Sequence, residues 1–306
     1  GGMLFQPDER EKGMASSGII SIKSFVQLAA EKNIGGMLCT AWDDKSPHME
    51  NYWRGFIAAA EYSWSPNAST LEEFDKAWLQ REFGLTFPDY VLFSSQLRQG
   101  SLLWYEAFYK EGGALDDYNT LQDFSQLEHW LPPADTKENS PVDYHAKLIE
   151  LPDLNAPGTW SRKYADRLDR ALNETTKFEE VSQRLKELYN NSSRNRYYWE
   201  LTMAMVDLQI TSPRLLLALK ECDNADIVRQ QSGIDQVQLA MKDFHKAWAN
   251  LQDVYGKTRF VAYPANYVPD RYFHLASQRE DLSWMIQAEE MYYSMIEQWL
   301  QLIGRL

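Results

Sequence analysis

Three long stretches with apolar residues at helical spacing occupy the second half of the chain and most constrain its fold. They cover residues 160–189, 196–219 and 227–254. Pro213 falls inside the second stretch, where its ring and missing N–H predict a kink or a break. Helices of this length bury their apolar faces by packing side by side, so the sequence predicts a helical bundle.

Two further helices are expected before these stretches. Ser69 and Glu72 have the spacing of a capping box, in which each side chain satisfies a free backbone amide of the other residue, and a helix to about Phe83 should follow. Pro88 suits the first turn of the next helix, which should stop at the glycine pair that begins at Gly112.

A last helix and one long irregular connection complete this region. A second pair with capping-box spacing, Ser277 and Glu280, predicts the start of a helix that runs toward Leu302. Residues 131–158 contain five prolines and little periodicity, which is typical of an irregular connection. Residues 66–306 are therefore expected to form an all-helical carboxy-terminal domain.

The first 65 residues follow a different pattern. Helical spacing over residues 19–33 is followed by the apolar run 36–42, which predicts a strand buried on both faces. The polar turn 43–47 then leads into a second helix that ends at about Trp64. This order is typical of an α/β barrel. The expected fold class is mainly α: a helical bundle that carries a portion of an α/β barrel, residues 1–65.

Charge and cysteine content exclude several classes of partner. The net charge of -13 repels phosphate backbones and anionic lipid headgroups, so no nucleic acid is expected to bind. No apolar run approaches the roughly 20 residues of a membrane-spanning helix. Cys39 and Cys222 lack the spacing of metal ligands, and two buried free thiols are favoured over a disulfide. No cofactor is expected.

The end of the predicted strand carries the residues best suited to bind a ligand. Trp42 offers a flat apolar face to a pyranose ring, and the carboxylates of Asp43 and Asp44 can accept hydroxyl hydrogen bonds. In an α/β barrel the reacting groups stand at the carboxyl ends of strands. The same residues also fit a core tryptophan followed by acidic residues that favour the start of a helix.

These residues lie in a run that resembles a known enzyme family. Residues 35–44 (Gly-Gly-Met-Leu-Cys-Thr-Ala-Trp-Asp-Asp), 52–56 (Tyr-Trp-Arg-Gly-Phe) and 59–66 (Ala-Ala-Glu-Tyr-Ser-Trp-Ser-Pro) resemble the eighth strand and helix of family 20 glycoside hydrolases, the β-N-acetylhexosaminidases. In that family a Trp-x-Glu packs against the sugar and binds its outer hydroxyls. Trp42 matches the stacking residue, while Asp44 stands at the acidic position and is one methylene shorter than Glu. The resemblance implies that residues 1–65 hold the last strand and flanking helices of a TIM-type (β/α)8 barrel. It also implies an amino-sugar glycan as substrate and a secreted, periplasmic or lumenal location.

The family's catalytic groups are an adjacent Asp-Glu pair after an earlier barrel strand. The Glu protonates the leaving oxygen, and the Asp holds the substrate's acetamido group, which attacks the anomeric carbon. In this chain the one adjacent Asp-Glu is Asp8-Glu9, in a charged segment without the family's preceding His and glycines. We therefore expect the catalytic pair to lie upstream of residue 1, no catalytic residue within this chain, and no hydrolysis by the chain alone.

Other chemistries have weaker support. The five histidines include no pair at metal-ligand spacing on a helix, and no phosphate-binding glycine loop or Gly-x-Ser-x-Gly elbow occurs. His48 follows Asp44 by four residues but fits a solvated histidine at a helix start. The alternatives to a glycosidase portion are a non-catalytic helical module that binds a glycan or a protein, and a helical sensor or assembly domain. Each of these three functions is compatible with association of the chain with the missing part of the barrel or with a second copy of itself.

Overall fold

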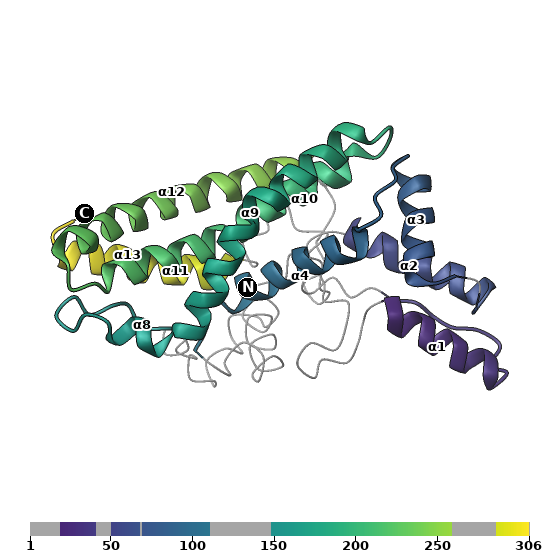
Figure 1. The fold of residues 1–306 in the computed structure, drawn as a ribbon, viewed down its shortest axis with the longest axis horizontal. Coiled ribbons are helices and arrows are strands. Elements are labelled where there is room, and N and C mark those ends of the chain that lie inside the picture. Colours follow the sequence, from purple (N-terminus) through teal and green to yellow (C-terminus); the bar gives the residue numbers. More distant parts are fainter. Residues whose placement is uncertain (1–18, 41–49, 68, 111–147, 259–285, 306) are drawn as a thin grey trace, which may run out of the picture.

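The structure, a computed structural model, describes residues 19–40, 50–67, 69–110, 148–258 and 286–305. Within these ranges the regular structure is helical, with no strand and one isolated antiparallel bridge between Tyr109 and Leu148 (Figure 1). The helices are α1 (Ile19–Glu31), α2 (Glu50–Trp64), α3 (Leu71–Glu82), α4 (Tyr90–Glu106), α8 (Thr159–Lys163), α9 (Ala165–Asn191), α10 (Arg196–Gln209), α11 (Thr211–Cys222), α12 (Ile227–Gly256) and α13 (Gln287–Leu302). In the described parts of the chain, no helix combines the length and apolar content needed to cross a membrane.

The predicted helical bundle is confirmed, and its centre is formed by α9, α10, α11 and α12. In Figure 1, α10 and α11 follow one another along the bundle and pack between α9 and α12. The predicted interruption near Pro213 is also observed, because α10 ends at Gln209 and α11 begins at Thr211. The proline ring would clash with the carbonyl group four residues earlier, at Gln209, and this is where the helix breaks.

The last helix, α13, attaches to the bundle through aromatic rings. Tyr292 stacks on Phe108, just after α4, with ring centroids 4.4 Å apart. Tyr293 packs on Phe244 of α12 with a centroid distance of 4.5 Å. The predicted start of this helix, at Ser277, lies outside the described residues.

The stretch predicted as one helix over residues 160–189 is divided at Tyr164. The backbone of this residue has φ -112° and ψ 25°, outside the α region, and it separates α8 from α9. Its hydroxyl donates to the Glu150 carboxylate, and the Trp160 indole N–H donates to the Glu150 carbonyl oxygen over 2.6 Å. These tertiary hydrogen bonds hold the two aromatic side chains on the segment before α8. The periodicity of the sequence does not predict such bonds, so it does not predict the break at Tyr164.

The capping box of α3 lies one residue later than predicted. Thr70 is the N-cap residue, and its hydroxyl accepts from the Glu73 N–H over 3.2 Å while the Glu73 carboxylate accepts from the Thr70 N–H over 2.8 Å. The prediction placed these roles at Ser69 and Glu72. Two hydroxyl residues and two glutamates stand side by side in the sequence, so both registers satisfy the same pattern.

The predicted strand is not formed over residues 36–40, which are irregular. Leu38, at the middle of the apolar run, is 84% exposed. A single strand has no stability without a neighbour to pair with, and no described segment supplies one. The part of the fold prediction that assigned a barrel remnant to this region is thus not supported by the described residues.

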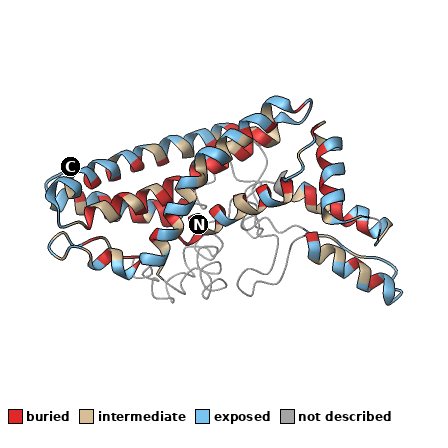
Figure 2. Ribbon diagram, viewed as in Figure 1, coloured by how far each residue is buried: buried red, intermediate tan, exposed pale blue. Residues whose placement is uncertain are grey.

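One apolar core joins most of the described elements. Figure 2 shows buried residues along the inward faces of the helices, and the cluster extends from Ile19 in α1 to Leu300 in α13. It includes Ala58 and Tyr62 of α2 together with Phe74 of α3, on both sides of the predicted domain boundary at residue 65. The division of the chain at that boundary stays a prediction.

Candidate functional site

The residues predicted to bind sugar, Trp42, Asp43 and Asp44, lie outside the described residues. The same is true of His48 and of the Asp8-Glu9 pair. The structure does describe the segments on both sides of the predicted site, namely residues 34–40 and helix α2.

A buried ion pair fixes α2 to the rest of the molecule. The Arg54 guanidinium donates to both carboxylate oxygens of Asp75 in α3, each over 2.7 Å. Both residues are buried, and the guanidinium carbon also lies 5.4 Å from the ring centroid of Tyr90. Burial raises the pKa of the Tyr90 phenol well above its ordinary value, so the ring stays neutral beside the pair. A two-pronged bond of this kind sets the orientation of α2 on α3 and α4.

Helix α1 packs against α2 and is held by polar bonds to the segment that follows α2. Lys23 donates through its ammonium group to the Ser69 carbonyl oxygen, and the Gln27 amide donates to the Pro66 carbonyl oxygen over 3.1 Å. The Lys23 ammonium also lies 5.1 Å from the centre of the Tyr62 ring. Helices α1 and α2 therefore form one packed unit, whose inner side is the side on which the two helices contact each other.

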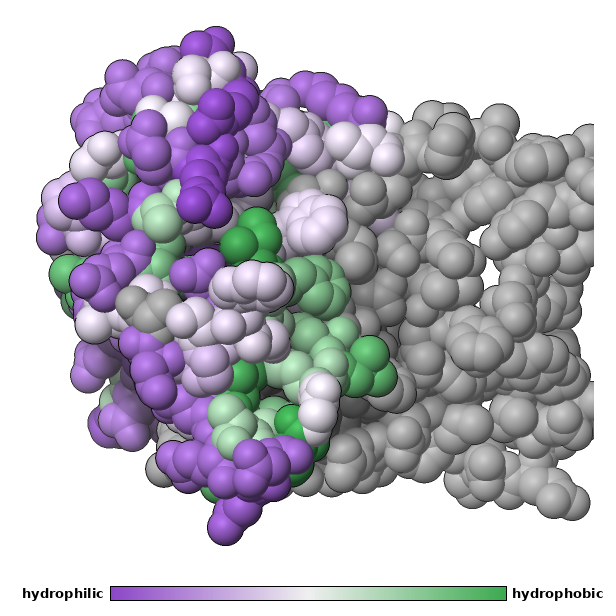
Figure 3. All heavy atoms as spheres, turned by 90° about the vertical axis from the view of Figure 1, so that its right-hand side faces the viewer, coloured by the Kyte–Doolittle hydropathy of each residue, from purple (hydrophilic) through white to green (hydrophobic). Residues whose placement is uncertain are grey.

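The outer side of this unit is rich in exposed apolar side chains. Of the fourteen large hydrophobic residues exposed in the described parts of the chain, eight fall between residues 20 and 64. Figure 3 views this end of the molecule and shows apolar side chains gathered among polar ones. We call these eight residues the α1–α2 apolar surface; they are Ile20, Phe25, Leu28, Ile34, Leu38, Trp53, Ile57 and Trp64.

This surface was not predicted from the sequence, although α2 carries a signal for it. Trp53 and Ile57 are exposed on α2, whereas Ala58 and Tyr62 on the same helix are buried. A surface helix normally confines its apolar residues to one stripe, and a helix that is apolar on more than one face is typical of burial on both sides. Helix α2 thus carries apolar side chains both on its buried face and on its exposed face.

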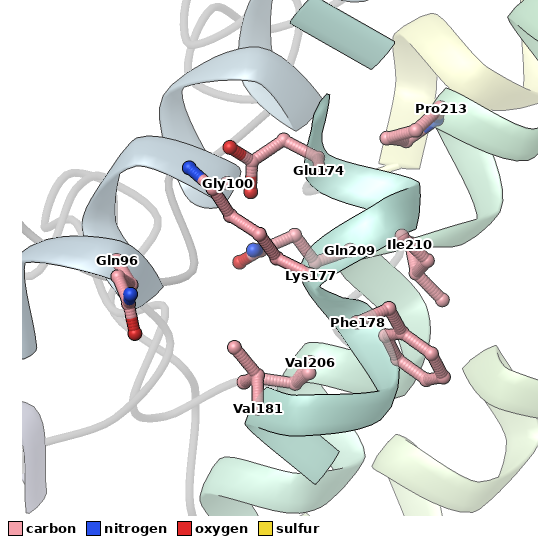
Figure 4. A pocket seen from close by; sticks show the side chains of 10 residues that line it. All are labelled: Gln96, Gly100, Glu174, Lys177, Phe178, Val181, Val206, Gln209, Ile210 and Pro213. Atoms are coloured by element: carbon pink, nitrogen blue, oxygen red, sulfur yellow. The ribbon is translucent and has the colours of Figure 1, made fainter. Parts of the chain in front are cut away.

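A pocket lies at a different place, between α4, α9 and the break that separates α10 from α11 (Figure 4). Its polar lining includes Gln96, Glu174, Lys177 and Gln209. The cavity measures about 20 Å³, which is room for roughly one water molecule. It is too small for a sugar ring, so it is not the substrate pocket that the sequence predicts.

Two carboxylates elsewhere have strongly shifted pKa values. Glu289 is fully buried on α13, and burial raises its pKa to about 7. At Glu150 burial acts in the same direction, but hydrogen bonds from Lys163 and Tyr164 outweigh it and lower the pKa to about 2. The described residues contain no group of three or more His, Cys, Asp or Glu side chains placed to hold a metal ion.

No protein family, no curated protein and no solved structure matches this chain.

Proposed function

We propose that this chain is the carboxy-terminal portion of a glycosidase similar to family 20, acting on N-acetylhexosamine-containing glycans by the substrate-assisted, retaining mechanism. In this proposal residues 1–65 complete a (β/α)8 barrel whose other strands and catalytic Asp-Glu pair precede residue 1. The helical domain, residues 66–306, supports the end of the barrel.

The α1–α2 apolar surface is the observation that carries the proposal. A barrel helix buries one face on the strands beside it, and a barrel strand is covered on both sides. The exposed side chains of Phe25 on α1, Leu38 in the connecting segment and Trp53 on α2 fall in the region that the family resemblance assigns to the closing strand and its helices. Exposed apolar area of this kind marks an interaction site.

Within such a barrel three residues of this chain would bind substrate. The Trp42 indole would stack on the sugar ring, and the Asp44 carboxylate would accept hydrogen bonds from its outer hydroxyls. Asp43 would form part of the same wall. None of the three supplies the general acid, so their contribution is to bind and orient the substrate.

The same surface also favours a second function, a non-catalytic helical module that docks a protein or a glycan. In that case the α1–α2 apolar surface would contact a separate partner, and residues 36–40 would have no strand neighbours within their own polypeptide. The upstream coding sequence separates the two functions, because barrel strands and an Asp-Glu pair precede residue 1 in the first case alone.

Turnover of an aryl N-acetylglucosaminide tests the proposal. The 306-residue chain should be inactive, and the polypeptide extended by its upstream sequence should be active. In the extended polypeptide Asp44→Asn should lower kcat/KM by at least about tenfold, because a charged acceptor of substrate hydroxyls is worth more than about 1.4 kcal/mol.

Asp253→Asn is the matched control, because Asp253 is exposed near the end of α12. It should leave turnover unchanged. Hydrolysis by the 306-residue chain alone, or an extended polypeptide that neither hydrolyses the substrate nor binds N-acetylglucosamine, would refute the proposal.

A further inference from the structure

One side of α2 carries a continuous stripe of exposed apolar residues. Trp53, Ile57, Ala60 and Trp64 follow one another at steps of four, three and four residues, and all four are exposed. At about 3.6 residues per turn these steps keep the four side chains within about 60° of one another around the helix. We call these four residues the α2 stripe.

The α2 stripe lies on the side of the helix directly opposite α1. The side toward α1 is marked by Gly55, where a Cβ atom would lie 3.9 Å from Cδ1 of Ile22. Gly55 is about 180° from the stripe around the helix axis. The positions that flank the stripe, Glu61 and Ser63, are exposed as well. The described residues therefore leave this side of α2 open to a partner.

The exposed area of the α2 stripe is large enough to hold two molecules together. Trp53 is 55% exposed and Trp64 is 91% exposed. At about 250 Å² for a whole tryptophan side chain, these two residues leave roughly 350 Å² uncovered in each copy of the chain. Two copies would bring together roughly 700 Å² of tryptophan surface, more than half of the about 1,200 Å² at which stable interfaces begin. The stripe contains no charged residue, so covering it costs little desolvation.

The spacing of the α2 stripe is the same when it is read in either direction along the helix. An antiparallel copy of α2 would therefore bring its own stripe into register, with Trp53 opposite Trp64 and Ile57 opposite Ala60. A large residue then faces a small one near the centre, and two indoles pair at each end. Steps of four and three residues also form the seam between two packed helices. A two-fold pair needs this self-complementary pattern, whereas an unrelated partner does not require it.

We propose that two copies of this chain associate through the α2 stripe, as a two-fold pair of antiparallel α2 helices. Helix α2 lies with α1 and α3 at one end of the molecule, away from the end that holds the C-terminus, so the second copy meets it from outside the bundle (Figure 1). This association goes beyond the proposed function. Of the three side chains that the proposed function names on the α1–α2 apolar surface, only Trp53 belongs to the stripe, so either account can fail without the other.

Sedimentation of the 306-residue chain over a range of concentrations tests the association. We expect a dimer with a Kd on the order of 1–10 μM, the affinity of a small interface. Ile57→Glu places a charge near the centre of the pair in both copies and should raise the Kd at least about 100-fold. Leu172→Glu is the matched control, because Leu172 is 51% exposed on α9, and it should leave the Kd unchanged. A chain that stays monomeric at about 100 μM, or equal effects of the two variants, would overturn the proposal.

A mixing experiment checks the antiparallel register without relying on the Ile57 variant. Trp53→Lys and Trp64→Glu should each weaken self-association, because in each case the introduced charge faces an indole of the second copy. Mixed in equal amounts, the two variants should form a heterodimer, in which the introduced lysine lies opposite the introduced glutamate and two unaltered indoles pair at the other end. Circular dichroism should show the helix content of the unaltered chain in both variants. A mixture that associates no better than either variant alone would be incompatible with the proposed pair.

Discussion

Gly233 of α12 lies directly against the backbone of Cys222 at the end of α11. A Cβ atom at residue 233 would lie 2.5 Å from the Cys222 amide nitrogen and 2.7 Å from the carbonyl carbon of Glu221. Backbone atoms cannot turn aside as the end of a side chain can. The contact therefore holds α11 and α12 at a distance that glycine alone permits at this position, and it buries the Cys222 thiol.

We expect Gly233→Ala to lower the free energy of unfolding by about 1–3 kcal/mol, because the added methyl group forces the two helices apart. Gly256→Ala is the matched control in the same helix, since a Cβ there meets nothing within 4 Å. Alanine is the better helix former by about 1 kcal/mol, so the control should be neutral or stabilising. Urea denaturation measures both, and equal effects would contradict the close approach.

The free energy of unfolding should respond differently to single and to double substitution of the buried pair Arg54 and Asp75. Arg54→Met leaves the Asp75 carboxylate buried without its cation, and we expect a loss of about 3–5 kcal/mol. Adding Asp75→Leu removes the stranded charge and should restore much of this loss. Arg229→Met, at an exposed pair with Glu221, should cost less than about 1 kcal/mol. A double variant no more stable than Arg54→Met would argue against this account.

Local signals in the sequence predicted most helices, and they failed where a distant contact decides the outcome. Pro213 fixed the break between α10 and α11 because its effect is covalent and acts four residues away. The break at Tyr164 depends on Glu150, fourteen residues earlier, and had no local signal. Periodicity likewise shows which side chains are apolar but not which helices meet, so the contact of Gly100 with Gln209 could not be predicted.

The apolar run at residues 36–40 shows the limit of a composition-based prediction. Its hydrophobicity predicts burial, yet a strand also needs a neighbour with which to exchange backbone hydrogen bonds. Leu38 is exposed because no described segment pairs with it. The candidate site at Trp42 and Asp44 depends on the same missing neighbours, so it stays a prediction drawn from the family resemblance.

The stability of the α13 attachment should depend on pH through Glu289. Burial raises the pKa of this carboxyl from 4.5 to about 7, so the folded chain binds its proton more tightly than the unfolded chain. The stability is therefore full below about pH 4.5, falls as pH rises and levels off above about pH 7. The total loss is on the order of 3 kcal/mol.

The titratable groups near Glu289 in the described residues are Tyr293 and Glu290 on α13, with His245 of α12 beside Tyr293. Glu289→Gln should flatten the dependence between pH 4.5 and 7, whereas Glu290→Gln, at an exposed position, should preserve it. Denaturation midpoints measured at several pH values give both slopes. An unchanged slope in Glu289→Gln would assign the dependence to other groups.

Two leucines with nearly equal exposure test whether the α1–α2 apolar surface is covered in a longer polypeptide. Leu38 is 84% exposed and Leu302, at the end of α13, is 86% exposed. In the 306-residue chain, Leu38→Ser and Leu302→Ser should each change the free energy of unfolding by less than about 0.5 kcal/mol. In the polypeptide extended upstream, Leu38→Ser should cost about 1.5–3 kcal/mol, because a leucine buried against barrel strands loses its transfer free energy. Leu302→Ser should remain neutral there. If both substitutions stay neutral in the extended polypeptide, its upstream part does not cover this surface, and the docking of a separate protein becomes the better account of α1 and α2.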